Sequence, residues 1–317
     1  MACYDVFNGD ADGICALQQL RLAAPRDSVL VTGVKRDIAL VARVPAVAGD
    51  SVTVLDVSFD KNRDACLALL ERGAFVRYFD HHYAGEVPEH PALETHIETL
   101  PDKGTALLVD EYLGGAHRAW AVVGTYGDNF DEAAARAAEP LGLADAELAL
   151  LRELGILINY NGYGAEVADL HFAPDALFRS IAPYADPLAF AREAPAFAQL
   201  RDGYREDMAR AEAAERVHPG PRHTYVVLPA AAWARRVGGV FANALAQREP
   251  ERAHALLTAR EDGGYVVSVR APLVTRDGAD ALCRQFETGG GRKAAAGIND
   301  LPDARVEDFI AAFVAAF

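Results

Sequence analysis

This chain lacks closely spaced cysteine pairs, a long apolar run and an excess of positive charge. Its 317 residues contain four cysteines, which are scattered and form no CxxC pair. Because no signal peptide is evident either, we expect a reduced cytoplasmic protein and not a disulfide-stapled one. No apolar stretch approaches the ~20 residues that span a bilayer. The sequence therefore predicts a protein without a transmembrane helix.

The charge balance is acidic. The 46 Asp and Glu residues outnumber the 31 Lys and Arg residues, which gives a formal net charge of -15. Such a charge argues against a general basic surface that grips long nucleic acid. Bound metal ions can still supply positive charge at one site, where an anionic substrate has to react. The length of the chain predicts two domains with a well-buried core.

Short apolar runs alternate with helical patterns in the first third of the chain, which is typical of a mostly parallel sheet. Strands are predicted at 3–8, 29–34, 51–57 and 74–79. Helices are predicted between and after them at 13–24, 38–44 and 61–72, from apolar residues at helical spacing. We therefore expect an α/β fold, with this N-terminal sheet flanked by helices.

The rest of the chain predicts further helices and then a second domain. From Gly104 to about residue 160 the pattern is mainly helical, and a long charged helix is expected at 196–216. It would end at the helix breaker His218-Pro219-Gly220-Pro221. The expected division is a first domain at 1–195, a connecting helix and linker at 196–221, and a smaller α+β domain at 222–317.

Acidic residues and histidines follow the predicted strands. Asp10 and Asp12 come after the first strand, Asp56 lies near the end of the third, and Asp80-His81-His82 closes the fourth. Ligands of an open parallel sheet bind outside the carboxyl ends of its strands. Carboxylates gathered there would repel one another unless divalent metals take their lone pairs. A further carboxylate, Asp128, follows a later apolar segment and completes the expected metal site.

Each part of this pattern has a plainer interpretation when it is taken alone. Asp-x-Asp-Gly is most often a turn or a helix N-cap. The same residues partly match a calcium loop, but its twelfth position is Gln19 where glutamate is needed. A single histidine after a strand is usually not a ligand. The combination of all these residues favours metal binding.

Five motifs together resemble the DHH phosphoesterase superfamily. DADG follows the first strand, VLDVSFD spans the third, FDHH ends the fourth, and a GD pair stands at 127–128. The fifth motif, GGGRKAAAGI at 289–298, resembles the glycine-rich signature of the DHH-associated C-terminal domain. Relatives in that superfamily include RecJ-like exonucleases, oligoribonucleases, cyclic dinucleotide phosphodiesterases and class II inorganic pyrophosphatases.

The resemblance implies roles for the residues that match its motifs. It implies two divalent ions, manganese (Mn2+) first and magnesium (Mg2+) as the alternative. One ion would be held by Asp10 and Asp56, and the second by a set that shares Asp56, namely Asp12, Asp56, His81 and Asp128. Asp80 would orient the histidines, and His82 would face the substrate phosphate as a catalytic residue.

Two positions depart from the usual motifs. Asn8 stands where many relatives place a metal-binding histidine, and an amide oxygen is a weaker, neutral ligand. Arg292 follows the glycines where the signature often has histidine. Arginine still contacts phosphate, in bidentate geometry where the site allows it. These departures predict a first metal that binds loosely or only together with substrate, and a substrate that differs from that of the typical member.

The C-terminal glycine cluster is a candidate phosphate site. Backbone N–H groups of Gly289, Gly290 and Gly291 would meet a substrate phosphate together with Arg292 and Lys293. Arg270, at the end of a predicted strand, is a further candidate. For the glycine cluster, the plainer interpretation is a flexible turn before a packed helix. For Arg270, it is a solvated residue at the end of an edge strand. Tyr160–Gly164 is interpreted as a helix C-cap in preference to a platform for stacking a base.

The expected function is metal-dependent hydrolysis of phosphodiester or phosphomonoester bonds in short oligonucleotides or small nucleotides. The acidic charge disfavours long duplex nucleic acid as a partner, and a homodimer is compatible with the pattern. Two alternatives stay open: a catalytically weak nucleotide-binding protein on the same fold, and a pyrophosphatase or polyphosphatase.

Overall fold

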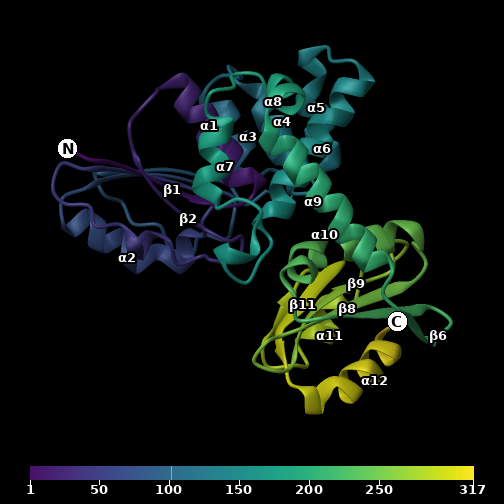
Figure 1. The fold of residues 1–317 in the computed structure, drawn as a ribbon. Helices are drawn as coiled ribbons and strands as arrows, with labels where there is room; N and C mark the ends of the chain where they lie inside the picture. The colour runs from purple at the N-terminus through teal and green to yellow at the C-terminus, as the bar shows by residue number, and fades with distance from the viewer. Residues whose placement is uncertain (101) are drawn as a thin grey trace. The chain divides into compact units, whose positions relative to one another are not determined.

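The computed structural model describes residues 1–100 and 102–317. The chain divides into two compact units, Met1–Asp202 and Gly203–Phe317, and each has its own β-sheet (Figure 1). The division falls within the segment 196–221 that the sequence predicts to connect two domains. The domain limits at 195 and 222 stay a prediction.

The first unit is built on a parallel sheet of five strands in the order β2-β1-β3-β4-β5. All of its pairings are parallel, so the carboxyl ends of the strands lie at one edge of the sheet. The predicted α/β fold with a mostly parallel N-terminal sheet is confirmed. The strands are β1 (Cys3–Asn8), β2 (Val29–Gly33), β3 (Ser51–Leu55), β4 (Phe75–Asp80) and β5 (Leu93–Ile97).

Helices cover both faces of this sheet. Helix α2 (Phe59–Glu71) lies on one face, and α1 (Ala11–Ala23), α3 (Thr105–Tyr112) and α7 (Pro174–Ile181) lie on the other (Figure 1). Alternate residues of the strands point to α2 and form a core with it, because successive side chains of a strand face opposite sides. That core includes Val6, Val54, Cys66, Leu69 and Tyr78.

Further helices complete the first unit. The α-helices are α4 (Arg118–Gly127), α5 (Asp131–Ala138), α6 (Asp145–Gly162), α8 (Pro187–Glu193) and α9 (Pro195–Glu212), which runs on into the second unit. Short 3-10 helices occur at Val41–Arg43, Glu139–Leu141 and Val167–Asp169. Among residues 1–100 and 102–317, no helix combines the length and the apolar character that crossing a bilayer requires.

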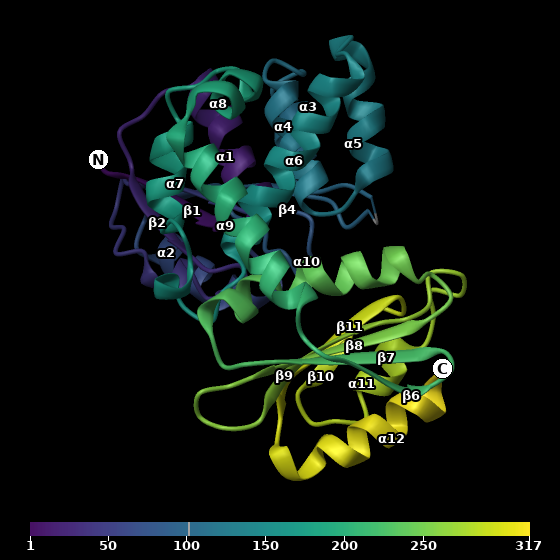
Figure 2. The same cartoon turned by 45° about the vertical axis from the view of Figure 1, so that its right-hand side comes forward.

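The second unit has a mixed sheet of six strands in the order β10-β11-β9-β8-β7-β6. Only β7 and β8 pair in parallel; the other pairings are antiparallel. Helix α10 (Ala232–Arg248) lies on one face, and α11 (Ala279–Cys283) and α12 (Val306–Ala316) lie on the other (Figure 2). The strands are β6 (Arg216–Gly220), β7 (His223–Leu228), β8 (Ala253–Ala259), β9 (Tyr265–Arg270), β10 (Gly289–Gly291) and β11 (Ala295–Leu301), and a 3-10 helix at Asp303–Arg305 precedes α12.

Two sequence-based expectations and one alternative interpretation were wrong in detail. The helix expected at 38–44 is only the 3-10 turn Val41–Arg43. The connecting helix ends at Glu212, and the expected breaker at 218–220 belongs to β6. Its proline is accommodated because β6 lies at the edge of the sheet, where one side of the strand needs no partner. The run after the glycine cluster forms strand β11 and not a helix.

The four cysteines are free thiols, and three of them are buried. Burial raises the pKa of Cys66 to about 11 and that of Cys283 to about 12, and it raises the pKa of Cys15 well above its ordinary value. At pH 8 a thiol with such a pKa is about one part in a thousand thiolate, the form that reacts. We expect a disulfide reagent to label only Cys3 within minutes at pH 8, and all four thiols in denaturant. Rapid labelling of more than one thiol in the native protein would contradict this burial.

Candidate metal centre

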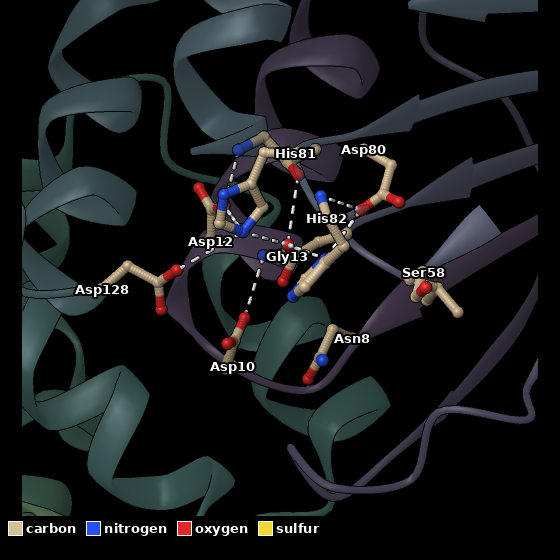
Figure 3. Close-up of polar contacts among 12 residues, drawn as sticks. Asn8, Asp10, Asp12, Gly13, Ser58, Asp80, His81, His82 and Asp128 are labelled. Carbon is tan, nitrogen blue, oxygen red and sulfur yellow. Dashed lines mark hydrogen bonds and ion pairs between the residues drawn. The ribbon is translucent and has the colours of Figure 1, made fainter. Parts of the chain in front are cut away.

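The carboxyl ends of three neighbouring strands bring the predicted acidic residues together. β1, β3 and β4 are adjacent in the sheet. Asp10 follows β1, Asp56 follows β3, and Asp80 is the last residue of β4. Because all three strands run in the same direction, their ends meet at one edge. The side chains of Asp10 and Asp12 converge there with those of His81 and Asp128 (Figure 3).

Asp10 and Asp12 are held at the first turn of α1. Asp10 is the N-cap of that helix, and its Oδ1 accepts a hydrogen bond from the N–H of Gly13 at 3.1 Å. The capping interpretation of this motif is therefore correct, and it places the second carboxyl oxygen toward the centre. Asp12, two residues later, is completely buried.

The first residues of α3 hold Asp12 by hydrogen bonds. Its two carboxyl oxygens accept hydrogen bonds from the backbone N–H groups of Thr105 at 2.6 Å and Ala106 at 2.7 Å. These are N–H groups that the first turn of a helix leaves without an internal partner, and they favour a carboxylate. The residue before them is Gly104, where a Cβ would come within 2.7 Å of Asp12 Oδ2. Glycine at this position is therefore required for the contact.

Asp56 adopts an unusual backbone conformation. Its φ is +58°, in the left-handed region that few residues other than glycine, asparagine and aspartate occupy. Its backbone N–H donates to the carbonyl oxygen of Phe79 at 3.0 Å, and its Oδ1 accepts from the hydroxyl of Thr105 at 3.1 Å. These contacts hold the strained turn and fix its carboxylate beside α3.

His81 lies at the middle of the acidic group. Its Nε2 is 3.4 Å from Asp56 Oδ1, 3.8 Å from Asp128 Oδ2 and 3.9 Å from Asp12 Oδ2. Asp128 comes from a distant part of the chain, at the C-cap of α4. Two sets of side chains bring their ligand atoms within 4.8 Å of one another, namely Asp12, His81 and Asp128, and Asp56, His81 and His82.

Asp80 is turned away from this group and supports it. Its Oδ2 accepts from the N–H of Phe59, the first residue of α2, at 3.0 Å. Its Oδ1 lies 2.7 Å from Nδ1 of His82 and accepts from the N–H of the same residue at 3.2 Å. The bond to Nδ1 fixes the ring of His82 and leaves its Nε2 for other partners (Figure 3).

Sequence reasoning missed one charged residue of the centre, Lys35. Its Nζ lies 2.5 Å from Asp10 Oδ2, 2.8 Å from Asp128 Oδ1 and 3.1 Å from Asn159 Oδ1. Lys35 follows the end of β2, the strand next to β1. Ligands of a parallel sheet bind outside the carboxyl ends of its strands, and applying this rule to β2 as well would have identified Lys35 as a candidate.

The charges shift the pKa values of the group in opposite directions. Burial, together with neighbouring carboxylates, raises the pKa of Asp12 to about 8 and holds that of Asp56 well above its usual range. Burial acts the same way on Asp10, but the charge and hydrogen bond of Lys35 outweigh it and lower the pKa. Burial lowers the pKa of His81, which keeps its ring neutral and able to bind a metal.

The sequence is not matched by any family model or by any curated protein. Solved structures do match it over nearly its whole length. An exonuclease RecJ bound to manganese is 19% identical, with a TM-score of 0.61 over 99% of this chain and 90% of that one. A DHH domain from a member of a family of ribosomal proteins is 12% identical, with a TM-score of 0.63 over 99% and 86%. The chain has the fold of these structures, one of which is a DHH domain.

Two further structures also match this chain, which covers about half of one and nearly all of the other. RecJ from Thermus thermophilus in complex with Mn2+ is 20% identical, with a TM-score of 0.63 over 99% of this chain. This chain spans only 51% of that RecJ. The pGpG-specific phosphodiesterase PggH from Vibrio cholerae is 15% identical, with a TM-score of 0.52 over 100% of this chain and 99% of that one.

Asn8, one of the two positions that depart from the motifs described above, has a side-chain oxygen that is available as a metal ligand. Its Nδ2 donates to the carbonyl oxygen of Lys35 at 3.1 Å. Its Oδ1 is buried and has no hydrogen-bond partner among the residues that the structure describes. A buried acceptor without a partner is uncommon. The amide oxygen, the carboxylates and the neutral imidazole fit a divalent cation that prefers oxygen and nitrogen ligands.

The candidate phosphate site of the second unit is built differently from the expected loop. Gly289–Gly291 form strand β10, and a Cβ at Gly289 would come within 1.7 Å of the carbonyl oxygen of Cys283. Arg270 donates from Nε to Asn243 Oδ1 at 2.6 Å, and Lys293 lies 3.2 Å from Asp277. Phosphate binding by Gly289, Gly290, Gly291, Arg270, Arg292 and Lys293 stays a prediction. The segment at 160–164 ends α6 with Tyr163 as its C-cap, in agreement with the plainer interpretation.

Proposed function

We propose that this protein is a divalent-metal-dependent phosphoesterase that hydrolyses short oligonucleotides or small nucleotides. The observation that carries the proposal is the convergence of three aspartates (Asp12, Asp56 and Asp128) and two histidines (His81 and His82) at the carboxyl edge of the parallel sheet. The likeness in fold to a manganese-bound exonuclease RecJ and to a pGpG-specific phosphodiesterase supports it. The net charge of -15 favours short substrates over long duplexes.

The metal is held by Asp12, Asp56, His81 and Asp128 in this proposal, with manganese as the first choice. When bound, a divalent ion neutralises charge on a phosphoryl group and lowers the pKa of a water molecule. Asp12 is fixed by α3 and Asp56 by its own strained turn, so both carboxylates are oriented before any ligand arrives. Such preorganisation avoids a reorganisation cost during the reaction.

His82 is the proposed proton donor to the leaving oxygen. Burial opposes its charged form, but the hydrogen bond and charge of Asp80 outweigh this effect and raise the pKa of His82. Because Asp80 accepts from Nδ1, the second proton of the imidazolium sits on Nε2. The side chain is 42% exposed, so a substrate has access to it. A leaving oxygen placed near Nε2 takes that proton as its bond to phosphorus breaks.

A substrate panel tests the proposal. Purified protein is incubated with Mn2+ and linear dinucleotides, cyclic dinucleotides, phosphoadenosine phosphate or pyrophosphate, and the products are separated by chromatography. We expect release of mononucleotide or phosphate from at least one nucleotide, and complete loss of release after chelation with EDTA. Nucleotide binding without any turnover would overturn the proposal. Hydrolysis of pyrophosphate alone would show that the substrate is pyrophosphate and not a nucleotide.

A further inference from the structure

Lys35 forms a complete set of contacts inside the candidate metal centre. Its ammonium group has three N–H donors, and three oxygens accept from it: Asp10 Oδ2 at 2.5 Å, Asp128 Oδ1 at 2.8 Å and Asn159 Oδ1 at 3.1 Å. The ring of Tyr163 lies 5.7 Å from the same nitrogen. This environment is one that would otherwise suit a bound cation.

The backbone around Lys35 is fixed on two sides. Its N–H donates to the carbonyl oxygen of Gly162, at the end of α6, at 2.9 Å. Its carbonyl oxygen accepts from Nδ2 of Asn8 at 3.1 Å. The side chain is 27% exposed, which is low for lysine. The ammonium group is thus held at the end of the strands and is not a solvated surface charge.

Both carboxylate oxygens of Asp10 already accept hydrogen bonds. One of its oxygens accepts from Gly13 and the other from Lys35. Asp10 belongs to neither set of side chains whose ligand atoms lie within 4.8 Å of one another. Asp12 and Asp56 form no ion pair with a lysine or arginine within residues 1–100 and 102–317. The carboxyl groups that lack a lysine or arginine partner are therefore those of Asp12 and Asp56, and not that of Asp10.

On the basis of the proposed function, we propose that the centre binds one divalent ion, at Asp12, Asp56, His81 and Asp128. The ammonium group of Lys35 takes the place of a second ion beside Asp10. With all four carboxyl groups ionised around the metal, their charge of about -4 is offset by about +3 from Lys35 and one divalent ion, which leaves about -1. A second divalent ion would have to displace Lys35 from Asp10 and Asp128.

Metal stoichiometry tests this inference without an activity measurement. The full chain is dialysed against Mn2+ at about 0.1 to 5 mM (on the order of the affinities of weak divalent sites), and bound metal is measured by mass spectrometry. We expect one equivalent for the parent protein and two for Lys35→Met, which keeps the length of the side chain and removes its charge. Lys61→Met, at an exposed lysine paired with Asp60, is the matched control and is expected to bind one equivalent.

Electron paramagnetic resonance of the bound Mn2+ gives a second readout. The parent protein should show the signal of an isolated ion, and Lys35→Met a signal altered by coupling between two ions. Two equivalents with a coupled signal in the parent protein would overturn the inference, and one equivalent in both proteins would overturn the role of Lys35. No bound metal at all would overturn the proposed function as well. If Lys35→Met does not fold, the stoichiometry and signal of the parent protein decide the question, and Lys35→Arg, which keeps the charge, should still bind one ion.

Discussion

Replacing Asp56 with asparagine is expected to lower Mn2+-dependent hydrolysis by at least about 1000-fold. Asp56 Oδ1 lies 3.4 Å from Nε2 of His81, within the proposed metal site. The amide keeps the shape of the side chain but loses the charge that holds a cation. Asparagine also tolerates the φ of +58°, which alanine would not, so the variant tests the charge and not the backbone. The turnover number and the metal content are measured on the same sample.

The same variant should be more stable than the parent protein when EDTA is present. Burial and nearby carboxylates raise the pKa of Asp56 above the unfolded value, so folding at pH 7 requires this carboxyl group either to take up a proton or to carry an unfavourable charge, and both destabilise the folded state. Removing that charge should raise the melting temperature by at least about 2 °C. Asp60→Asn, at a residue on the surface of α2, is the control and should leave turnover unchanged. Turnover of Asp56→Asn within tenfold of the parent protein would contradict the assignment.

Replacing His82 with alanine is expected to lower turnover by at least about 100-fold while the metal content stays nearly unchanged. His82 is the outermost imidazole of the centre, and Asp80 holds its ring through a bond of 2.7 Å. Its removal takes away the proposed proton donor but leaves His81 and the carboxylates in place. Turnover is measured with the best substrate of the panel, and metal content by mass spectrometry.

Added imidazole separates a chemical role of His82 from a structural one. Because the side chain is 42% exposed, free imidazole can enter the space that alanine leaves and restore part of the lost turnover. His90→Ala, at an exposed histidine outside the centre, should behave like the parent protein with or without imidazole. If His82→Ala hydrolysed substrate as fast as the parent protein, we would withdraw the role given to His82.

The parallel sheet and its acidic edge were predictable because the signals are local. Apolar runs of strand length end directly at polar clusters, as in the run that Asp80 closes. The direction of parallel strands then brings such clusters together, however far apart they are in the sequence. This reasoning placed Asp10, Asp56 and His81 at one edge. The short edge strand β5 and helices α7, α8 and α12 were not predicted, because their patterns are short or alanine-rich.

The place of Lys35 at a strand end could be predicted, but the partners of Lys35 and Asp12 could not be predicted from local patterns. A lysine after a strand is usually solvated, and its partners Asp128 and Asn159 are 93 and 124 residues away. The amides that hold Asp12 belong to a helix that starts 93 residues later. The left-handed conformation of Asp56 also has no sequence signal, because aspartate is common in ordinary turns. Tertiary packing alone fixes these features.

The close approach of α3 to Asp12 extends the constraint on the centre beyond the residues that hold charge. Gly104 supplies no atom to a cation or a substrate, yet any side chain there would push into the carboxylate. The position of the Asp12 carboxylate thus depends on the small size of residue 104 as well as on the hydrogen bonds from α3. A mutational scan for positions that do not tolerate substitution would have to include Gly104.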